Sequence, residues 1–194
     1  MGTLVMIEFL TVDGVMQGLG SPQEDPEGGF PHGGWGAPYA RSIHQVTASS
    51  GLERTSAYLF GRRTYEKMAA FWPHQPGDDP MAAHLNATPK YVTSRTLTEA
   101  AWAGTRILAT DVLGAVHDLK AAEDGDVAVL GSGVLCRELL AADLVDEIRL
   151  FVHPLLLGTG KRLFGELPAP RHLALRSVAR TDLGTVALVY GARG

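Results

Sequence analysis

The sequence of 194 residues has a single cysteine, Cys136. A single cysteine excludes an internal disulfide and is typical of a protein from a reducing compartment. Cys136 lies in the apolar run that begins with Val134 and Leu135. This setting predicts a small buried side chain rather than a reactive thiol.

Long apolar runs and an excess of basic residues are also missing. No run approaches the roughly 18 residues of a membrane-spanning helix, and the N-terminal stretch lacks a basic region and carries Glu8, unlike a signal peptide. Lys and Arg number 17 against 21 Asp and Glu, so the chain has no general basic surface for nucleic acid. We therefore expect a cytoplasmic protein without a membrane or nucleic-acid partner. One phosphorylated small molecule would need only a local cluster of cations.

The common local motifs for metals and nucleotides are absent as well. No two of the 7 histidines are three to five residues apart and cysteine pairs are missing, so we expect no metal site. The segment LGTGKRLF at 157–164 lacks the first glycine of a P-loop and has Arg162 where that motif needs Ser or Thr. Neither G-x-S-x-G nor a full G-x-G-x-x-G occurs, which argues against a nucleophile elbow and a Rossmann fold.

The sequence does contain an alternation of strand and helix patterns. Strand patterns occur at 3–10, 56–60, 90–94, 105–109, 126–131 and 147–154. Helical patterns occur at 39–52, 64–72, 81–86, 111–123 and 134–142. Two further strands, 172–181 and 184–191, predict an antiparallel hairpin at the end of the chain. The alternation predicts an α/β fold with a mainly parallel sheet in one domain over residues 1–194.

Residues 17–38 are rich in glycine and proline and are too long for a simple connection. Such a segment is either a functional loop or a flexible one. Phe30 and Trp35 within it favour a loop that packs on the rest of the protein.

Three predicted strand ends carry groups that suit a phosphate. Gly131, Ser132 and Gly133 stand between a strand and a helix, where backbone N–H groups can face an anion. The sequence LFGRRT puts two arginines at a helix start, where the dipole favours an anion and not a cation. The sequence YVTSRT adds a third cation just past a strand. A tight turn without a ligand and two solvated arginines stay open as alternatives.

In open α/β sheets, ligands bind at the carboxyl ends of the strands. One long ligand with separated phosphates, such as NADPH, would explain all three segments. Its diphosphate would meet the glycine turn and a helix start, and its 2′-phosphate would meet the arginines.

The segments YLFGRRTYEKM, YVTSRT and VLGSGVLCRELLAADLVDEIRLFVHPLLLGTGKRLF resemble, in this order and spacing, the dihydrofolate reductase-like superfamily. They are most similar to the reductase (RibD C-terminal) domain of the riboflavin-biosynthesis deaminase–reductase and its small stand-alone relatives. The resemblance implies a three-layer α/β/α fold with a mostly parallel central sheet, an antiparallel C-terminal hairpin, and NADPH as hydride donor. A homodimer is a further expectation from the resemblance, which the sequence alone does not show.

The resemblance also implies roles for individual residues. The phosphate-binding helix start would contain Gly61, Arg62, Arg63 and Thr64. The adenosine ribose and its 2′-phosphate would meet Thr93, Ser94 and Arg95. The diphosphate and nicotinamide would be lined by Gly131, Ser132, Gly133, Val134 and Leu135. Asp13 and Trp35 are the counterparts of substrate-side residues; Asp13 is the candidate for proton relay or substrate anchoring, and His153 the candidate for a further substrate contact.

The sequence departs from its relatives at two points. The stretch YARSIHQVTASSGLE has no acidic residue until Glu53, whereas true dihydrofolate reductases use an acid in their first helix to bind the pteridine. No zinc motif of a deaminase precedes the domain. We therefore expect a reduction step alone, on a small-molecule substrate that the sequence leaves open.

The leading hypothesis is an NADPH-dependent oxidoreductase that acts on a C=O or C=N group of a small heterocyclic or sugar-derived substrate. The type reaction would be that of 5-amino-6-(5-phosphoribosylamino)uracil reductase in riboflavin biosynthesis. The alternatives are a non-catalytic NADP(H)-binding protein, a pteridine or dihydrofolate-type reductase, and a structural domain without a cofactor. Without a functional role, Asp13 would close an Asp-Gly turn, and His153 would be a packed, hydrogen-bonded histidine.

Overall fold

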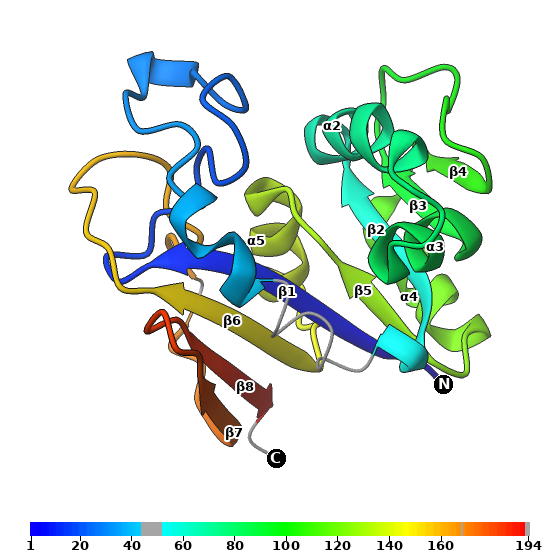
Figure 1. The fold of residues 1–194 in the computed structure, drawn as a ribbon. Coiled ribbons are helices and arrows are strands. Elements are labelled where there is room, and N and C mark those ends of the chain that lie inside the picture. Colours follow the sequence, from blue (N-terminus) through cyan, green and yellow to red (C-terminus); the bar gives the residue numbers. More distant parts are fainter. Residues whose placement is uncertain (44–51, 168, 193–194) are drawn as a thin grey trace. The chain divides into compact units, whose positions relative to one another are not determined.

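The computed structural model describes residues 1–43, 52–167 and 169–192 (Figure 1). The strands are β1 (Thr3–Thr11), β2 (Thr55–Gly61), β3 (Lys90–Thr93), β4 (Thr105–Leu108), β5 (Asp126–Val129), β6 (Glu147–His153), β7 (Leu173–Arg180) and β8 (Val186–Ala192). The α-helices are α2 (Arg62–Phe71), α3 (Pro80–Ala87), α4 (Val112–Ala122) and α5 (Gly133–Ala141). Short 3-10 helices are η1 (Glu27–Gly29), η2 (Ala37–Tyr39), η3 (Leu52–Arg54) and η4 (Trp72–His74).

The strands are ordered β4-β3-β2-β5-β1-β6-β8-β7 in one sheet. The pairs β3–β4, β2–β3, β2–β5 and β1–β5 are parallel, whereas β6–β8 and β7–β8 are antiparallel. The predicted α/β fold, with a mostly parallel sheet and an antiparallel C-terminal hairpin, is confirmed.

The chain divides into two compact units. The first unit combines Met1–Met6 with Gly51–Asp146, and the second combines Ile7–Ser50 with Glu147–Gly194. We describe each unit by itself. That residues 1–194 form a single domain stays a prediction.

The first unit is built on parallel strands that are buried on both faces. All four residues of β5 are buried, and six of the seven in β2. This burial explains why both strands read as nearly continuous apolar runs. The helix α3 begins at Pro80, with the side chain of Asp79 accepting hydrogen bonds from the N–H groups of Met81 and Ala82, both at 2.9 Å.

Two element boundaries in the first unit differ from prediction. The strand β5 ends at Val129 rather than at 131, because Gly131 turns the chain with φ +84°. The helix α2 begins at Arg62, two residues before the predicted start. Both arginines therefore belong to the first helical turn.

The second unit contains the packed loop 17–38 and the C-terminal hairpin. Phe30 and Trp35 form a small core with Val15, and Leu19, Leu155 and Leu157 pack against it. The prediction that this loop packs on the protein is thus confirmed. Of the helix predicted at 39–52, residues 40–43 are helical, and 44–51 lie outside the described residues.

Candidate functional site

The three predicted phosphate-binding segments follow neighbouring strands of the first unit. The strand β2 lies between β3 and β5, and all three run parallel. Gly61 at the end of β2 pairs with Thr93 of β3, and Leu59 pairs with Val129 of β5. Because neighbouring strands are about 4.8 Å apart, the two outer segments are separated by roughly 10 Å along this edge. Sequence order alone did not place β2 in the middle.

The end of β2 and the turn after β5 are in close contact. The N–H of Gly61 donates to the carbonyl of Gly131 at 2.9 Å. A Cβ atom on Gly61 would collide with the Oγ of Ser132. Glycine at position 61 is therefore required for the two segments to approach each other.

Both helices that start at this edge begin without a side-chain cap. Gly61 is the N-cap of α2 and Ser132 that of α5, and neither forms a side-chain cap hydrogen bond. Neither helix has an acidic residue in its first turn. The first N–H groups of a helix have no partner within the helix, and they attract an anion. Two such helix starts at adjacent strand ends suit a ligand with more than one phosphate.

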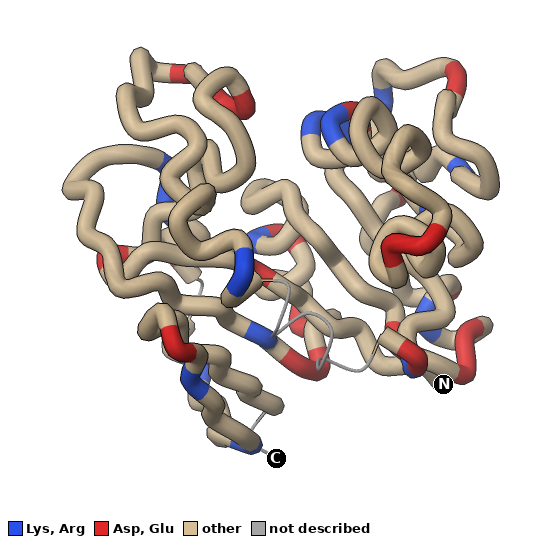
Figure 2. The backbone as a smooth tube through the Cα atoms, in the orientation of Figure 1, with Lys and Arg blue, Asp and Glu red and all other residues tan. Residues whose placement is uncertain are grey.

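Basic residues follow one another in the first turn of α2 (Figure 2). Arg62 and Arg63 are both exposed, and Thr64 is half-buried. The guanidinium of Arg62 contacts the carboxylate of Glu66 at 3.2 Å. Sequence reasoning overlooked Glu66, although its position four residues after Arg62 on a predicted helix could have shown this pair.

The turn after β3 is held by its own hydroxyl groups. The Oγ of Ser94 accepts hydrogen bonds from the N–H groups of Thr96 at 3.2 Å and Leu97 at 2.9 Å. The hydroxyl of Thr93 donates to the carbonyl of Phe60 at 3.4 Å. Arg95 is exposed. Of residues 93–95, Arg95 is therefore the one whose side chain is accessible to a ligand.

The turn after β5 presents backbone more than side chains. Gly133 and Leu135 are buried, whereas Val134 is 58% exposed. The peptide bond between Gly131 and Ser132 is cis. An apolar exposed residue beside uncapped N–H groups suits a ligand with a phosphate and a flat ring.

Asp13, the candidate for proton relay, is engaged within the second unit. Its carboxylate accepts hydrogen bonds from the Thr11 hydroxyl at 2.6 Å, Leu157 N–H at 3.3 Å and Gly158 N–H at 2.8 Å. These hydrogen bonds lower the pKa of Asp13 to about 2. The bond from Thr11 contributes most, and the bonds from the two N–H groups add to it. Asp13 is therefore ionised at neutral pH and joins the turn after β1 to the loop after β6.

Trp35 and His153 lie together in the second unit. The indole Nε1 of Trp35 donates to the carbonyl of Gln17 at 2.7 Å, and its ring meets His153 edge-on with centroids 5.5 Å apart. His153 is fully buried among aromatic rings that include Tyr39, and its Nδ1 lies 3.0 Å from the hydroxyl of Thr185. Burial lowers the pKa of His153 to about 4. Its Nε2 finds no hydrogen-bond partner among the described residues.

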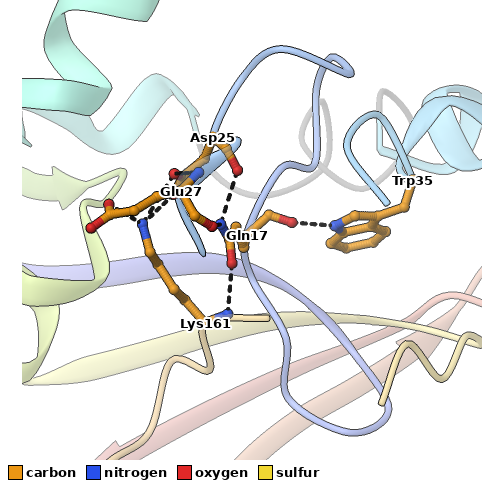
Figure 3. A network of polar contacts seen from close by, with 5 residues as sticks. All are labelled: Gln17, Asp25, Glu27, Trp35 and Lys161. Carbon is orange, nitrogen blue, oxygen red and sulfur yellow. Dashed lines mark hydrogen bonds and ion pairs between the residues drawn. The ribbon is translucent and has the colours of Figure 1, made fainter. Parts of the chain in front are cut away.

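A polar network ties loop 17–38 to the segment after β6 (Figure 3). The ammonium of Lys161 contacts the carboxylates of Asp25 and Glu27, each at 2.7 Å. The side chain of Gln17 accepts from the Lys161 N–H and donates to the carbonyls of Asp25 and Glu27. Burial opposes the charge of Lys161, but the two carboxylates outweigh it and raise its pKa. Nothing in the local sequence pattern indicated these contacts.

A cavity of about 380 Å³ lies beside this network. It is lined by Gln17, Glu27, Gly28, Gly29, Phe30, Pro31, Thr159, Gly160 and Lys161. None of the three predicted substrate residues lines it. The volume suits a small molecule, and sequence reasoning did not foresee the cavity.

The fold is that of the dihydrofolate reductase-like proteins. Residues 3–187 match the RibD C-terminal domain family, and the chain belongs to that family. It is a family of reductase type.

A protein of Bacillus subtilis (strain 168) named "Uncharacterized protein YyaP" is 29% identical over 143 residues, which are 72% of this chain and 75% of that protein.

Solved structures share the fold. A protein from Shewanella sp. PV-4, provisionally assigned to riboflavin biosynthesis, has a TM-score of 0.73 at 18% identity, with 99% of each chain covered. The dihydrofolate reductase of Enterococcus faecalis, solved with NADP(H), has a TM-score of 0.60 at 12% identity, covering 99% of this chain and 97% of that one. A pyrimidine reductase-like protein from Corynebacterium diphtheriae has a TM-score of 0.57 at 12% identity, covering 99% and 92%.

The described part of the chain has neither a membrane-spanning helix nor a cluster of metal ligands. None of the helices in residues 1–43, 52–167 and 169–192 is both long and apolar enough to span a membrane. Over the same residues, no group of three or more His, Cys, Asp or Glu side chains could hold a metal ion.

Proposed function

We propose that this protein is an NADPH-dependent reductase of a small heterocyclic or sugar-derived molecule. The observation that carries the proposal is the row of three segments at neighbouring strand ends of the first unit. In order along the edge, they are 93–95, 61–64 and 131–135. A dinucleotide is long enough to contact all three, and its charged groups match what each segment offers.

The residues of the first unit fit this cofactor. The starts of α2 and α5 would hold the diphosphate, because they lack a side-chain cap and the first N–H groups of a helix attract an anion. Arg62 and Arg95 would meet the 2′-phosphate, with Arg63 beside them. Val134 and Leu135 would lie against the nicotinamide. When bound, NADPH supplies a hydride to the carbon of a C=O or C=N group, and a proton completes the reduction at the oxygen or nitrogen.

The second unit, taken by itself, contains a cavity and Asp13, the candidate for proton relay. The cavity of about 380 Å³ has room for a small substrate. Asp13 would position the turn after β1 and the loop after β6 through its hydrogen bonds to Leu157 and Gly158. It would not donate the proton, because its carboxylate is already ionised at neutral pH. We assign the proton for the reduction to solvent. The alternative that Asp13 relays a proton predicts a loss of turnover in Asp13→Asn without a change in NADPH affinity.

A non-catalytic NADP(H)-binding protein is the second candidate. It is favoured by the internal contacts of the predicted substrate residues: Asp13 and Trp35 use their polar groups within the unit, and His153 is fully buried. Measured oxidation of NADPH in the presence of pterins, pyrimidines and ribosylamines separates the two candidates. Turnover with any of them supports the reductase.

The cofactor proposal is tested by calorimetric titration with NADPH and NADH. We expect NADPH to bind more tightly than NADH, because only NADPH carries the 2′-phosphate. The variants Arg62→Ala and Arg95→Ala should each weaken NADPH binding about five- to tenfold and leave NADH binding unchanged. Equal affinities for the two nucleotides, or no binding of either, would overturn the proposal.

A further inference from the structure

One contact in the first turn of α2 is left unused by the proposed function. Arg62 contacts Glu66 at 3.2 Å, and each side chain is 45% exposed. Both residues lie on α2, so the pair is entirely within the first unit. The side chain proposed to meet a phosphate thus already has a carboxylate partner.

The order of this pair is the reverse of what a helix favours. The helix dipole favours an acidic residue near the first turn and a basic residue further along. A pair with the acid on the N-terminal side is accordingly the more stabilising one. In α2 the cation comes first, at Arg62, and the acid comes four residues later. Helix stability therefore does not explain why these two residues occupy these positions.

A nucleotide phosphate would change the partner of Arg62. The 2′-phosphate of NADPH carries negative charge, so it attracts the guanidinium and repels the carboxylate of Glu66. NADH has a neutral hydroxyl at the same place and would leave the pair intact. The contact with Glu66 thus costs free energy only when the incoming nucleotide carries the 2′-phosphate.

We propose that Glu66 sets the nucleotide specificity of this site by competing with the 2′-phosphate for Arg62. The inference rests on the proposed function and deepens it. Glu66 neutralises Arg62 when the site lacks a 2′-phosphate and weakens the binding of NADPH. Glu66 thereby reduces the difference in affinity between NADPH and NADH and makes NADPH dissociate more readily.

The test is a double-mutant cycle measured by calorimetric titration with NADPH and NADH. The proteins are the unmodified chain, Glu66→Gln, Arg62→Ala and the double variant. Glu66→Gln should tighten NADPH binding about two- to fivefold, the range expected for an exposed ion pair, and leave NADH binding unchanged. In the Arg62→Ala background, the same change at position 66 should have no effect on NADPH.

A control separates this effect from a general change in charge. Asp118 lies on α4 with its side chain 88% exposed. Asp118→Asn removes the same charge from the same unit and should leave both affinities unchanged. A circular dichroism spectrum equal to that of the unmodified chain shows that α2 is intact in Glu66→Gln.

The possible failures are distinguishable. If the unmodified chain binds neither nucleotide, or binds both equally, the proposed function fails first. If it prefers NADPH but Glu66→Gln binds NADPH unchanged or more weakly, the proposed function stands and the role of Glu66 is overturned. If Glu66→Gln tightens NADPH equally in the absence of Arg62, the effect does not run through Arg62 and the inference is also overturned.

Discussion

At the scale of single residues, burial decides the protonation of His153. The ring is fully buried, its Nδ1 contacts the Thr185 hydroxyl, and its pKa falls from 6.5 to about 4. The folded protein therefore keeps this histidine neutral at a pH where the unfolded chain already binds a proton.

This difference predicts a loss of stability in mild acid. Between pH 6.5 and about 4, the unfolded state binds more protons than the folded state at His153, so stability rises with pH in that window. The contribution lost on going from pH 7 to pH 4 is about 3 kcal/mol. Urea unfolding at a series of pH values measures it. The variant His153→Gln cannot titrate there and should have a flatter pH dependence; an unchanged slope would show that other groups are responsible.

Asp13 shows how one residue type can support two interpretations. The Asp-Gly pair is typical both of a tight turn and of the resembled family's substrate side. Two of the three hydrogen bonds to its carboxylate, from Leu157 and Gly158, come from residues about 145 positions further along the chain; the third comes from Thr11 in the same turn. The turn is thus part of its role, whereas contact with a substrate stays a prediction.

At the scale of elements, loop 17–38 depends on one glycine that leaves room for its aromatic side chain Phe30. Gly160 has φ +114°, and a Cβ atom there would approach the Phe30 ring to 2.7 Å and Val15 to 2.8 Å. Gly158, two residues earlier, also has a positive φ of +74°, but a Cβ atom there would meet open space. Both positions therefore need a positive φ, but Gly160 lies further from the left-handed helical region and is also packed against side chains.

These neighbouring glycines provide a matched pair of variants. Gly158→Ala should cost about 1 kcal/mol of stability, from backbone strain alone. Gly160→Ala should cost about 2–4 kcal/mol, because it adds a collision with Phe30 and displaces loop 17–38. Thermal unfolding measures the difference, and limited proteolysis within 17–38 shows whether the loop is released. Equal costs at both positions would mean that Phe30 does not occupy the slot beside Gly160.

The helix α2 illustrates a boundary that matters for function. The sequence pattern placed both arginines at the helix start, with the helical pattern itself beginning at Thr64. The structure begins the helix at Arg62, directly after the last residue of β2. The strand and helix therefore adjoin without a connection, and the arginines stand beside the N–H groups that an anion would need.

At the scale of the whole molecule, cofactor binding should raise stability by mass action. A ligand that binds only the folded state stabilises it by about 2.7 kcal/mol at a concentration 100 times its Kd. We expect NADPH to raise the unfolding temperature and to slow amide hydrogen exchange at 61–64 and 131–135. NADH at the same concentration should have a smaller effect. Protection confined to the second unit would contradict the assignment of the nucleotide to the first.

Much of the fold could be predicted from the sequence because its signals are local. The strands β2 and β5 are apolar on both faces, and α4 repeats its apolar residues at helical spacing, so element type follows from neighbours in the chain. The three candidate phosphate-binding segments were selected from the sequence because each combines a strand end with glycines or cations, and their role stays a prediction. Their grouping as a single ligand site stays a prediction.

Local residue patterns were enough to predict the strands, the helices after residue 52, the family, and the residue types at each strand end. The folded chain was needed to show that β2 lies between β3 and β5, that Lys161 contacts Asp25 and Glu27, and that a cavity lies beside them. The pairing of Arg62 with Glu66 could have been predicted from the sequence, because residues four positions apart are neighbours on a helix. Contacts such as that of Gln17 with Lys161 join residues 144 positions apart. They depend on the path of the whole chain, which a local pattern of residues does not contain.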